Sequence, residues 1–250
     1  MSKKSELFKI LLFFIFLIMA LNQLAKITNT LIHIYLLIFI TLLYLLSKIN
    51  VFNCSDAFKF SKKDIKITLI LCIIISILQF FSFKFIYPKL YSNQNFVLNN
   101  ILMILILEQL LNCIIEEIFF RGYIFSLLNT KFTDKVYVFV SSIIFAIYHI
   151  IIFNVSSIIE CIMLSIFTLS VGICLGYIYI KTSNLLPCIL IHTVYNLSQN
   201  IISLEFNSIN LGIQNIYIQF GYPSVIFIIT LLVYIYYNKW NINREISHNE

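Results

Sequence analysis

The sequence predicts an all-α, polytopic membrane protein with about eight transmembrane helices, and two observations lead to this prediction. Of the 250 residues, 60% are hydrophobic and 11% are charged, and the mean hydropathy is +0.95. Soluble domains carry about 25% charged residues, so lipid is the expected solvent here. The apolar runs are continuous rather than alternating, and the chain has only three Pro and five Gly. Such runs are typical of membrane helices, whereas a membrane barrel needs alternation.

Stretches long enough to cross about 30 Å of hydrocarbon define the expected helices. They cover approximately residues 7–25, 29–47, 67–86, 98–128, 136–153, 157–180, 184–203 and 222–238. The first stretch resembles a signal peptide, but it is too long and lacks a small-residue cleavage site, so we expect it to remain as an anchor. No repeat or soluble segment interrupts the pattern, and residues 1–250 are expected to form one membrane domain.

The basic residues predict the orientation of the chain. Most of them fall in one alternate set of loops and tails: Lys3, Lys4, Lys9, Lys48, Lys59, Lys62, Lys63, Lys66, Arg121, Lys131, Lys135, Lys181, Lys239 and Arg244. The opposite set holds Lys26, Lys84 and Lys89. Because cytoplasmic loops carry the excess of Lys and Arg, both termini are expected in the cytoplasm. This pattern also accounts for the net charge of +6, so no nucleic-acid partner is expected. Frequent Ile, Lys and Asn are typical of an AT-rich genome, which favours a bacterial source and therefore a bacterial cell membrane.

The fourth expected span contains the densest group of ionisable residues, within Cys113-Ile-Ile-Glu116-Glu117-Ile-Phe-Phe-Arg121-Gly122. Charged groups inside a membrane are costly and usually have a function. Glu117 and Arg121 lie four apart on one helical face, which predicts an ion pair. Glu116 points about 100° away and has no cationic partner on that helix. Such a carboxylate suits either a general base or the proton-carrying group of a transporter.

Two further spans contain polar residues at a similar depth. His149 lies in the fifth span, and His192 and Asn196 share one face of the seventh. From the cytoplasmic end, at 1.5 Å per residue, Glu116 and Asn196 lie about 20 Å deep, His149 about 21 Å and His192 about 14 Å. A single histidine in a span more often forms an interhelical hydrogen bond. The common level instead predicts one polar cavity between the three helices.

Other hydrolytic chemistries lack their residues in this chain. The aspartates Asp56, Asp64 and Asp134 all fall in expected loops, which excludes an intramembrane aspartyl pair. No H-E-x-x-H zinc motif or glycine-flanked serine nucleophile occurs. The six cysteines are scattered singly, mostly in apolar runs, and are interpreted as small hydrophobic residues rather than as a metal or disulfide framework.

Three motifs occur in order along three separate spans: Glu116-Glu117-x-x-x-Arg121, Phe145-x-x-x-His149 and His192-x-x-x-Asn196. In this order they resemble the motifs of the CPBP family, which includes type II CAAX prenyl endopeptidases, Abi proteins and bacteriocin-processing and immunity proteases. The resemblance covers roughly residues 98–203, which would form the catalytic core.

The resemblance implies an intramembrane endopeptidase. By it, Glu116 would activate a water molecule and His149 would position that water or exchange protons. His192 and Asn196 would stabilise the oxyanion of the tetrahedral intermediate. The substrate would be a membrane-associated protein or a leader peptide.

The resemblance also implies supporting roles for Glu117 and Arg121, which would hold the site together. The family has been described both as metal-dependent and as metal-free. We expect catalysis without a cofactor, while Glu116, His149 and His192 would be the ligands of a zinc ion if one is required.

Two alternatives from other functional classes remain open at this point. One is a non-catalytic bacteriocin-immunity or membrane binding protein, and the other is a small proton-coupled transporter that uses Glu116. Two more patterns are interpreted as structural: the stripe of Glu108, Asn112 and Glu116, and the close-packing motif Gly172-x-x-x-Gly176.

Overall fold

The computed structural model describes residues 62–86, 100–125, 133–153, 157–206 and 222–247, and all of the regular secondary structure among these residues is helical. The helices are α4 (Lys62–Ile86), α6 (Asn100–Glu117), the π-helix η1 (Ile118–Ile124), α8 (Asp134–Phe153), α9 (Ile158–Thr182), α10 (Leu185–Phe206) and α12 (Tyr222–Ser247). The expected all-α class is confirmed for this part of the chain. The expected spans 7–25 and 29–47 lie outside the described residues.

Three of the described helices contain apolar windows long enough to cross a membrane: Asp64–Phe81, Asp134–Ile152 and Ile158–Thr182. Shorter apolar stretches occupy Leu185–Ser198 and Ser224–Tyr236. The expectation of a polytopic membrane protein therefore has support in the helices, while the total of eight spans stays a prediction.

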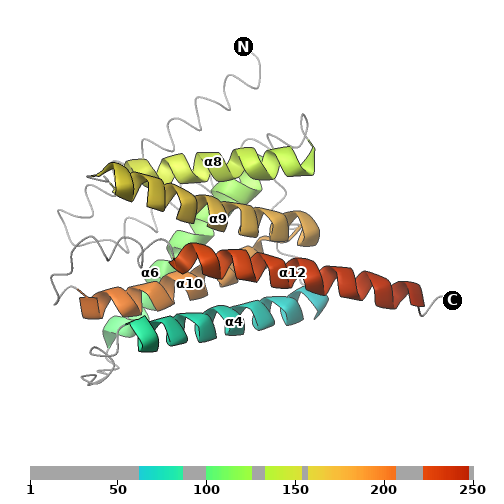
Figure 1. Ribbon diagram of the computed structural model, residues 1–250, viewed down its shortest axis with the longest axis horizontal. Helices are drawn as coiled ribbons and strands as arrows, with labels where there is room; N and C mark the ends of the chain where they lie inside the picture. Colours follow the sequence, from blue (N-terminus) through green and yellow to red (C-terminus); the bar gives the residue numbers. More distant parts are fainter. Residues whose placement is uncertain (1–61, 87–99, 126–132, 154–156, 207–221, 248–250) are drawn as a thin grey trace, which may run out of the picture.

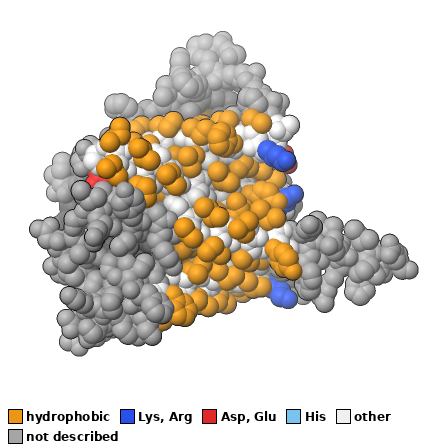
Figure 2. Space-filling view, in the orientation of Figure 1, with side chains coloured by type: hydrophobic (Ala, Val, Ile, Leu, Met, Phe, Trp, Pro, Cys, Tyr) orange, Lys and Arg blue, Asp and Glu red, His pale blue; other side chains and the backbone are white. Residues whose placement is uncertain are grey.

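The outward faces of the helices are apolar, as contact with lipid requires. Ile73 on α4 is 58% exposed, Phe139 on α8 is 55% exposed and Leu232 on α12 is 60% exposed. Figure 2 shows hydrophobic side chains covering the described part of this face, with Lys and Arg side chains gathered along one edge. A soluble protein rarely exposes so continuous an apolar surface.

The helices are arranged so that α6 and η1 cross behind the others (Figure 1). α8 lies along α9, α10 packs against α4, α6 and α9, and α12 packs against α9 and α4. α6 and η1 therefore have neighbours on several helices, and the polar residues of α6 meet those of α8 and α10.

A close approach of α8 and α9 confirms the interpretation of Gly172-x-x-x-Gly176 as a packing motif. A methyl group at Gly172 would stand 2.8 Å from the Cβ atom of Ser142, and one at Gly176 would stand 3.2 Å from Val138. At Gly172 the neighbouring atoms include the backbone of Ser142, so this separation requires glycine. The motif therefore sets the distance between α8 and α9 beside the polar cluster.

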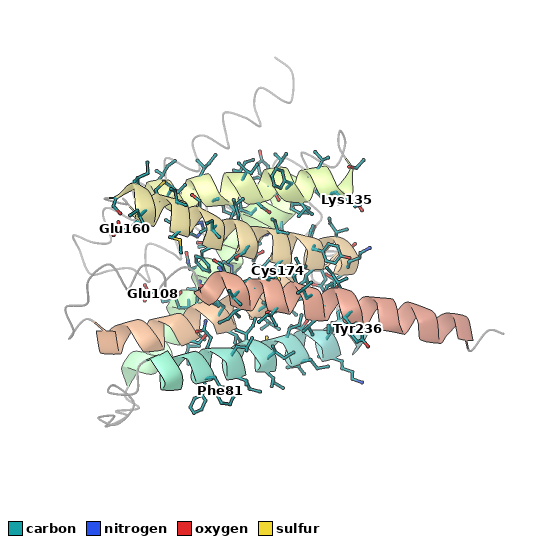
Figure 3. The ribbon with its side chains drawn as sticks, in the orientation of Figure 1. Phe81, Glu108, Lys135, Glu160, Cys174 and Tyr236 are labelled. Carbon is teal, nitrogen blue, oxygen red and sulfur yellow. The ribbon has the colours of Figure 1, made fainter. Side chains whose placement is uncertain are left out.

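Three lysines on different helices lie at one end of the bundle. α4 and α8 begin there and α9 ends there (Figure 1), so Lys66, Lys135 and Lys181 share that end. Figure 3 labels Lys135 at this end and Glu108 and Glu160 at the opposite end. This distribution agrees with the loop assignment made from the sequence, in which all three lysines lie on the cytoplasmic side.

Candidate active site

The acidic pair Glu116-Glu117 ends α6, and the chain continues directly into the π-helix η1. Every residue of η1 is buried, including Arg121, which is 1% exposed. π-helical turns are uncommon and are frequent at functional sites. The sequence does not predict this turn, because a continuous apolar run does not distinguish a π-helix from an α-helix.

The predicted ion pair between Glu117 and Arg121 is confirmed. Arg121 Nη1 lies 2.9 Å from Glu117 Oε1, and both side chains are almost completely buried. Arg121 Nη2 also donates to the backbone oxygen of Gly172 at 3.4 Å, and the guanidinium carbon lies 4.7 Å from the centre of the Phe145 ring. The guanidinium thus joins η1 to α8 and α9, which compensates a charge that would be costly to bury alone.

Glu117 also orients a histidine on α10. Its Oε1 atom accepts a hydrogen bond from His192 Nδ1 at 2.8 Å. Because an ionised carboxylate can only accept hydrogen bonds, the proton of the imidazole stands on Nδ1 in this contact. The second ring nitrogen, Nε2, is then directed towards Glu116, at 3.8 Å from its Oε2 atom.

His149 on α8 is held in a similar way. Its Nδ1 atom lies 2.8 Å from the backbone oxygen of Phe145, which can only accept a hydrogen bond. Its Nε2 atom lies 3.9 Å from Glu116 Oε2. The prediction from depth that Glu116, His149 and His192 lie close together is therefore confirmed, with α6, α8 and α10 contributing one residue each.

The polar neighbours of Glu116 come from its own helix and from two others. α6 has no basic residue to pair with it, as expected, and α8 and α10 each place an imidazole ring next to it. Its Oε1 atom accepts a hydrogen bond from Asn112 Nδ2 at 3.2 Å. Its Oε2 atom is buried and has no hydrogen-bond partner within the described residues. Asn112 thereby orients the carboxylate, while the packing of the stripe against another helix stays a prediction.

Three acceptor atoms face one another at the centre of this cluster. With Nδ1 protonated, a neutral imidazole presents a lone pair at Nε2, and Glu116 Oε2 presents another. The separations of 3.8 and 3.9 Å exceed a direct hydrogen bond. Glu116 Oε2 has no hydrogen-bond partner within the described residues, and a water molecule about 2.8 Å from this atom and from one of the Nε2 atoms would supply a donor.

The same atoms are the donors that a zinc ion uses in proteins. Both Nδ1 atoms are held by outer acceptors, an arrangement common among zinc-bound histidines. The described residues contain no group of three His, Cys, Asp or Glu in metal-binding geometry. Tetrahedral zinc would place its ligand atoms about 3.3 Å apart, so binding it here would draw Glu116, His149 and His192 closer together.

Asn196 lies one helical turn beyond His192 on α10, but its side chain meets a different partner. Its Nδ2 atom donates to the sulfur of Cys113 at 3.4 Å. Cys113 is completely buried on α6. This contact was not predicted from the sequence, in which the cysteines are interpreted as small hydrophobic residues. The one sequence feature that could have indicated the contact is the position of Cys113, one helical turn before the acidic pair.

Phe145 forms one wall of the cluster. Its ring centre lies 4.2 Å from that of His149 and 6.1 Å from that of His192, and the ring packs edge to face against Phe120. The aromatic side chain therefore limits water around the imidazoles while contacting Arg121 through its face. Low local polarity strengthens the electrostatic interactions among these groups.

Comparison with known proteins agrees with this arrangement. Residues 97–198 match the model of a family described as type II CAAX prenyl endopeptidase Rce1-like. The matched segment contains all of the polar residues of the cluster, from Asn112 to Asn196. No curated protein matches the chain significantly. The family resemblance inferred from the three motifs is therefore confirmed.

Proposed function

From the membership of residues 97–198 in the Rce1-like branch of the CPBP family of proteases, we propose that this protein is an intramembrane endopeptidase. Its substrate is a peptide bond in a membrane-associated protein or a leader peptide. Water activated by Glu116 and the neighbouring histidines performs the hydrolysis.

One observation carries the proposal: a buried carboxylate oxygen without a hydrogen-bond partner in the described residues faces two imidazole nitrogens from other helices. Burying an unsatisfied carboxylate oxygen is costly, and unlike Glu117 Oε2, which is also buried without a partner, Glu116 Oε2 lies between two imidazole Nε2 atoms. A water molecule held between Glu116 and the imidazoles removes that cost. It also stands beside a base, which is the arrangement that hydrolysis requires.

In the proposed reaction, the bound water donates one proton to Glu116 Oε2 as its oxygen attacks the carbonyl carbon of the peptide bond. His149 holds the water through Nε2, because its Nδ1 is engaged by the Phe145 carbonyl. The resulting tetrahedral intermediate carries a negative oxygen. Glu116 then returns the proton to the leaving amine, which breaks the carbon–nitrogen bond.

His192 and Asn196 are proposed to stabilise the negative oxygen. Asn196 supplies an N–H group, and His192 supplies one from Nε2 when the ring is protonated. Two carboxylates and one guanidinium leave the cluster with one negative charge in excess. Glu117, 2.8 Å from Nδ1, would balance a protonated His192.

We propose that the reaction needs no metal. Glu116 Oε2 lies 3.8 and 3.9 Å from the two Nε2 atoms, and one water molecule can bridge such separations by hydrogen bonds. The ligand atoms of a zinc ion would lie closer together. If zinc is resident, Glu116, His149 and His192 would hold it, and the ion would supply a more acidic water.

The location proposed for the protein is a bacterial cell membrane with both termini in the cytoplasm. The support is the apolar outer surface and the gathering of Lys66, Lys135 and Lys181 at one end. A substrate anchored in the same bilayer reaches a site between the helices without leaving the membrane. This is the reason to propose membrane-associated substrates.

The test uses the purified full-length protein in lipid vesicles with a panel of fluorogenic peptides. Each peptide is attached to the bilayer by a hydrophobic leader segment or a lipid anchor. We expect cleavage by the wild type and a loss of at least about a hundredfold in Glu116→Gln, since the amide is not a base. Glu108→Gln, a half-buried glutamate on the same helix, is the matched control and should remain active.

Equal rates for Glu116→Gln and the wild type would exclude the proposed role of Glu116. No cleavage of any panel peptide by the wild type would contradict the protease and favour a binding or immunity role.

A further inference from the structure

We infer that Cys113 is a positioning residue that holds the Asn196 amide in the orientation required to stabilise the oxyanion. The inference rests on the proposed function and extends it to a residue outside the three motifs. It starts from the hydrogen bond that Asn196 Nδ2 donates to Cys113 Sγ at 3.4 Å. Cys113 is completely buried, so solvent does not compete for this contact.

The contact is one of two matching contacts between α6 and α10. Glu117 holds His192, and Cys113, four residues earlier on α6, holds Asn196, four residues later on α10. The helices run in opposite directions (Figure 1). Four residues back along α6 and four residues forward along α10 therefore both cover about 6 Å in the same direction, so Cys113 lies level with Asn196 as Glu117 lies level with His192. α6 therefore orients both proposed oxyanion donors of α10, one through a carboxylate and one through a thiol.

The chemical need for the contact follows from the shape of an amide. Asn196 has one face that donates through Nδ2 and one that accepts through Oδ1, and rotation by 180° exchanges them. A carbonyl oxygen turned towards the oxyanion would repel it. The sulfur of Cys113 accepts one N–H of the amide, which fixes the orientation and leaves the second N–H for the intermediate. A weak acceptor such as sulfur achieves this without introducing another charge.

Removing the acceptor should lower turnover without removing the donor. Loss of an entire oxyanion donor costs about a hundredfold to a thousandfold in kcat in other hydrolases. Cys113→Ala leaves Asn196 present but free to rotate, so we expect kcat to fall about tenfold with KM little changed. Cys113→Ser restores a hydrogen-bond acceptor and should recover most of this loss. Cys188→Ala is the matched control, because Cys188 is equally buried and its thiol donates to Leu175 O at 3.3 Å.

The decisive measurement is a double-mutant cycle on kcat, made in lipid with the panel peptide that the wild type cleaves fastest. If Cys113 acts through Asn196, Cys113→Ala should have no further effect in the Asn196→Ala background. Equal effects in both backgrounds would overturn the inference. So would a loss in Cys188→Ala as large as that in Cys113→Ala. Full activity of Asn196→Ala would instead remove the proposed oxyanion role of Asn196.

An infrared measurement tests the contact without any cleavage. The S–H stretching band of Cys113 is identified as the difference between the wild type and Cys113→Ala. It should shift when Asn196→Ala removes the N–H donor, and it should stay in place in Ser198→Ala, which alters a nearby residue on α10. An unshifted band in Asn196→Ala would refute the contact even if the protein cleaves none of the peptides.

Discussion

Replacing Glu117 by glutamine tests the central part of the site, because one oxygen of this residue serves two neighbours. Oε1 accepts from Arg121 Nη1 at 2.9 Å and from His192 Nδ1 at 2.8 Å, and the side chain has no exposed surface. Glutamine keeps the shape and a carbonyl oxygen, but it carries no charge. Arg121 then stays buried without its counter-charge.

Removing one partner of a buried ion pair costs about 3–5 kcal/mol. Glutamine retains an acceptor for Arg121 and His192, so we expect the lower end, a loss of about 3 kcal/mol in the free energy of unfolding. The hydrogen bond that orients His192 also becomes weaker. In metal sites, the loss of the residue that hydrogen-bonds a ligand histidine lowers activity about 10- to 100-fold. We expect a decrease of similar size in kcat.

The assay is equilibrium unfolding in mixed detergent–lipid micelles, with peptide cleavage measured on the same samples. Glu108→Gln serves as the control and should change the free energy of unfolding by less than about 1 kcal/mol. The double variant Glu117→Gln/Arg121→Met removes both charges and should be more stable than Glu117→Gln alone. A Glu117→Gln protein as stable as the wild type, or a double variant less stable than the single one, would refute the reasoning.

Three further predictions concern packing, cofactor and orientation. Gly172→Ala should destabilise the protein by about 1–3 kcal/mol in thermal unfolding, because its Cβ would meet the backbone of Ser142 at 2.9 Å. Gly176→Ala should cost less, since the nearest atoms belong to side chains; the reverse order would contradict the packing argument. Cleavage should persist after prolonged treatment with a chelator, whereas loss that added zinc restores would show a metal enzyme. A cysteine at Lys135 should react with an impermeant thiol reagent only in inside-out vesicles, and one at Glu160 only in right-side-out vesicles; the opposite result would reverse the proposed orientation.

Local sequence patterns predicted the helices and part of the site. The apolar runs predicted α8 and α9 closely, because each residue in lipid contributes to insertion according to its own hydropathy. The spacing of Glu117 and Arg121 predicted their ion pair, since residues four apart on a helix are neighbours wherever the helix packs. The common depth of Glu116 and His149 depended only on rise per residue and on alternating chain direction.

The contacts between helices were less accessible from the sequence. Glu116 and Glu117 point in directions about 100° apart, yet both reach His192, one through each ring nitrogen. Such a contact depends on the rotation and register of α6 against α10. The sequence pattern leaves these undetermined, since several rotations bury a helix that is apolar on all sides.

The sequence alone thus predicted the described helices, the residues that carry charge at a cost within them, and the family that the three motifs indicate. Only the tertiary structure decided the π-helical turn after Glu117, the orientation of both imidazoles towards Glu116, and the contact of Asn196 with Cys113. The physical reason is the range of the interactions. Hydropathy and helical spacing act within a few residues of the chain. Close packing instead selects one arrangement of neighbouring helices, through contacts such as that of Gly172 with Ser142.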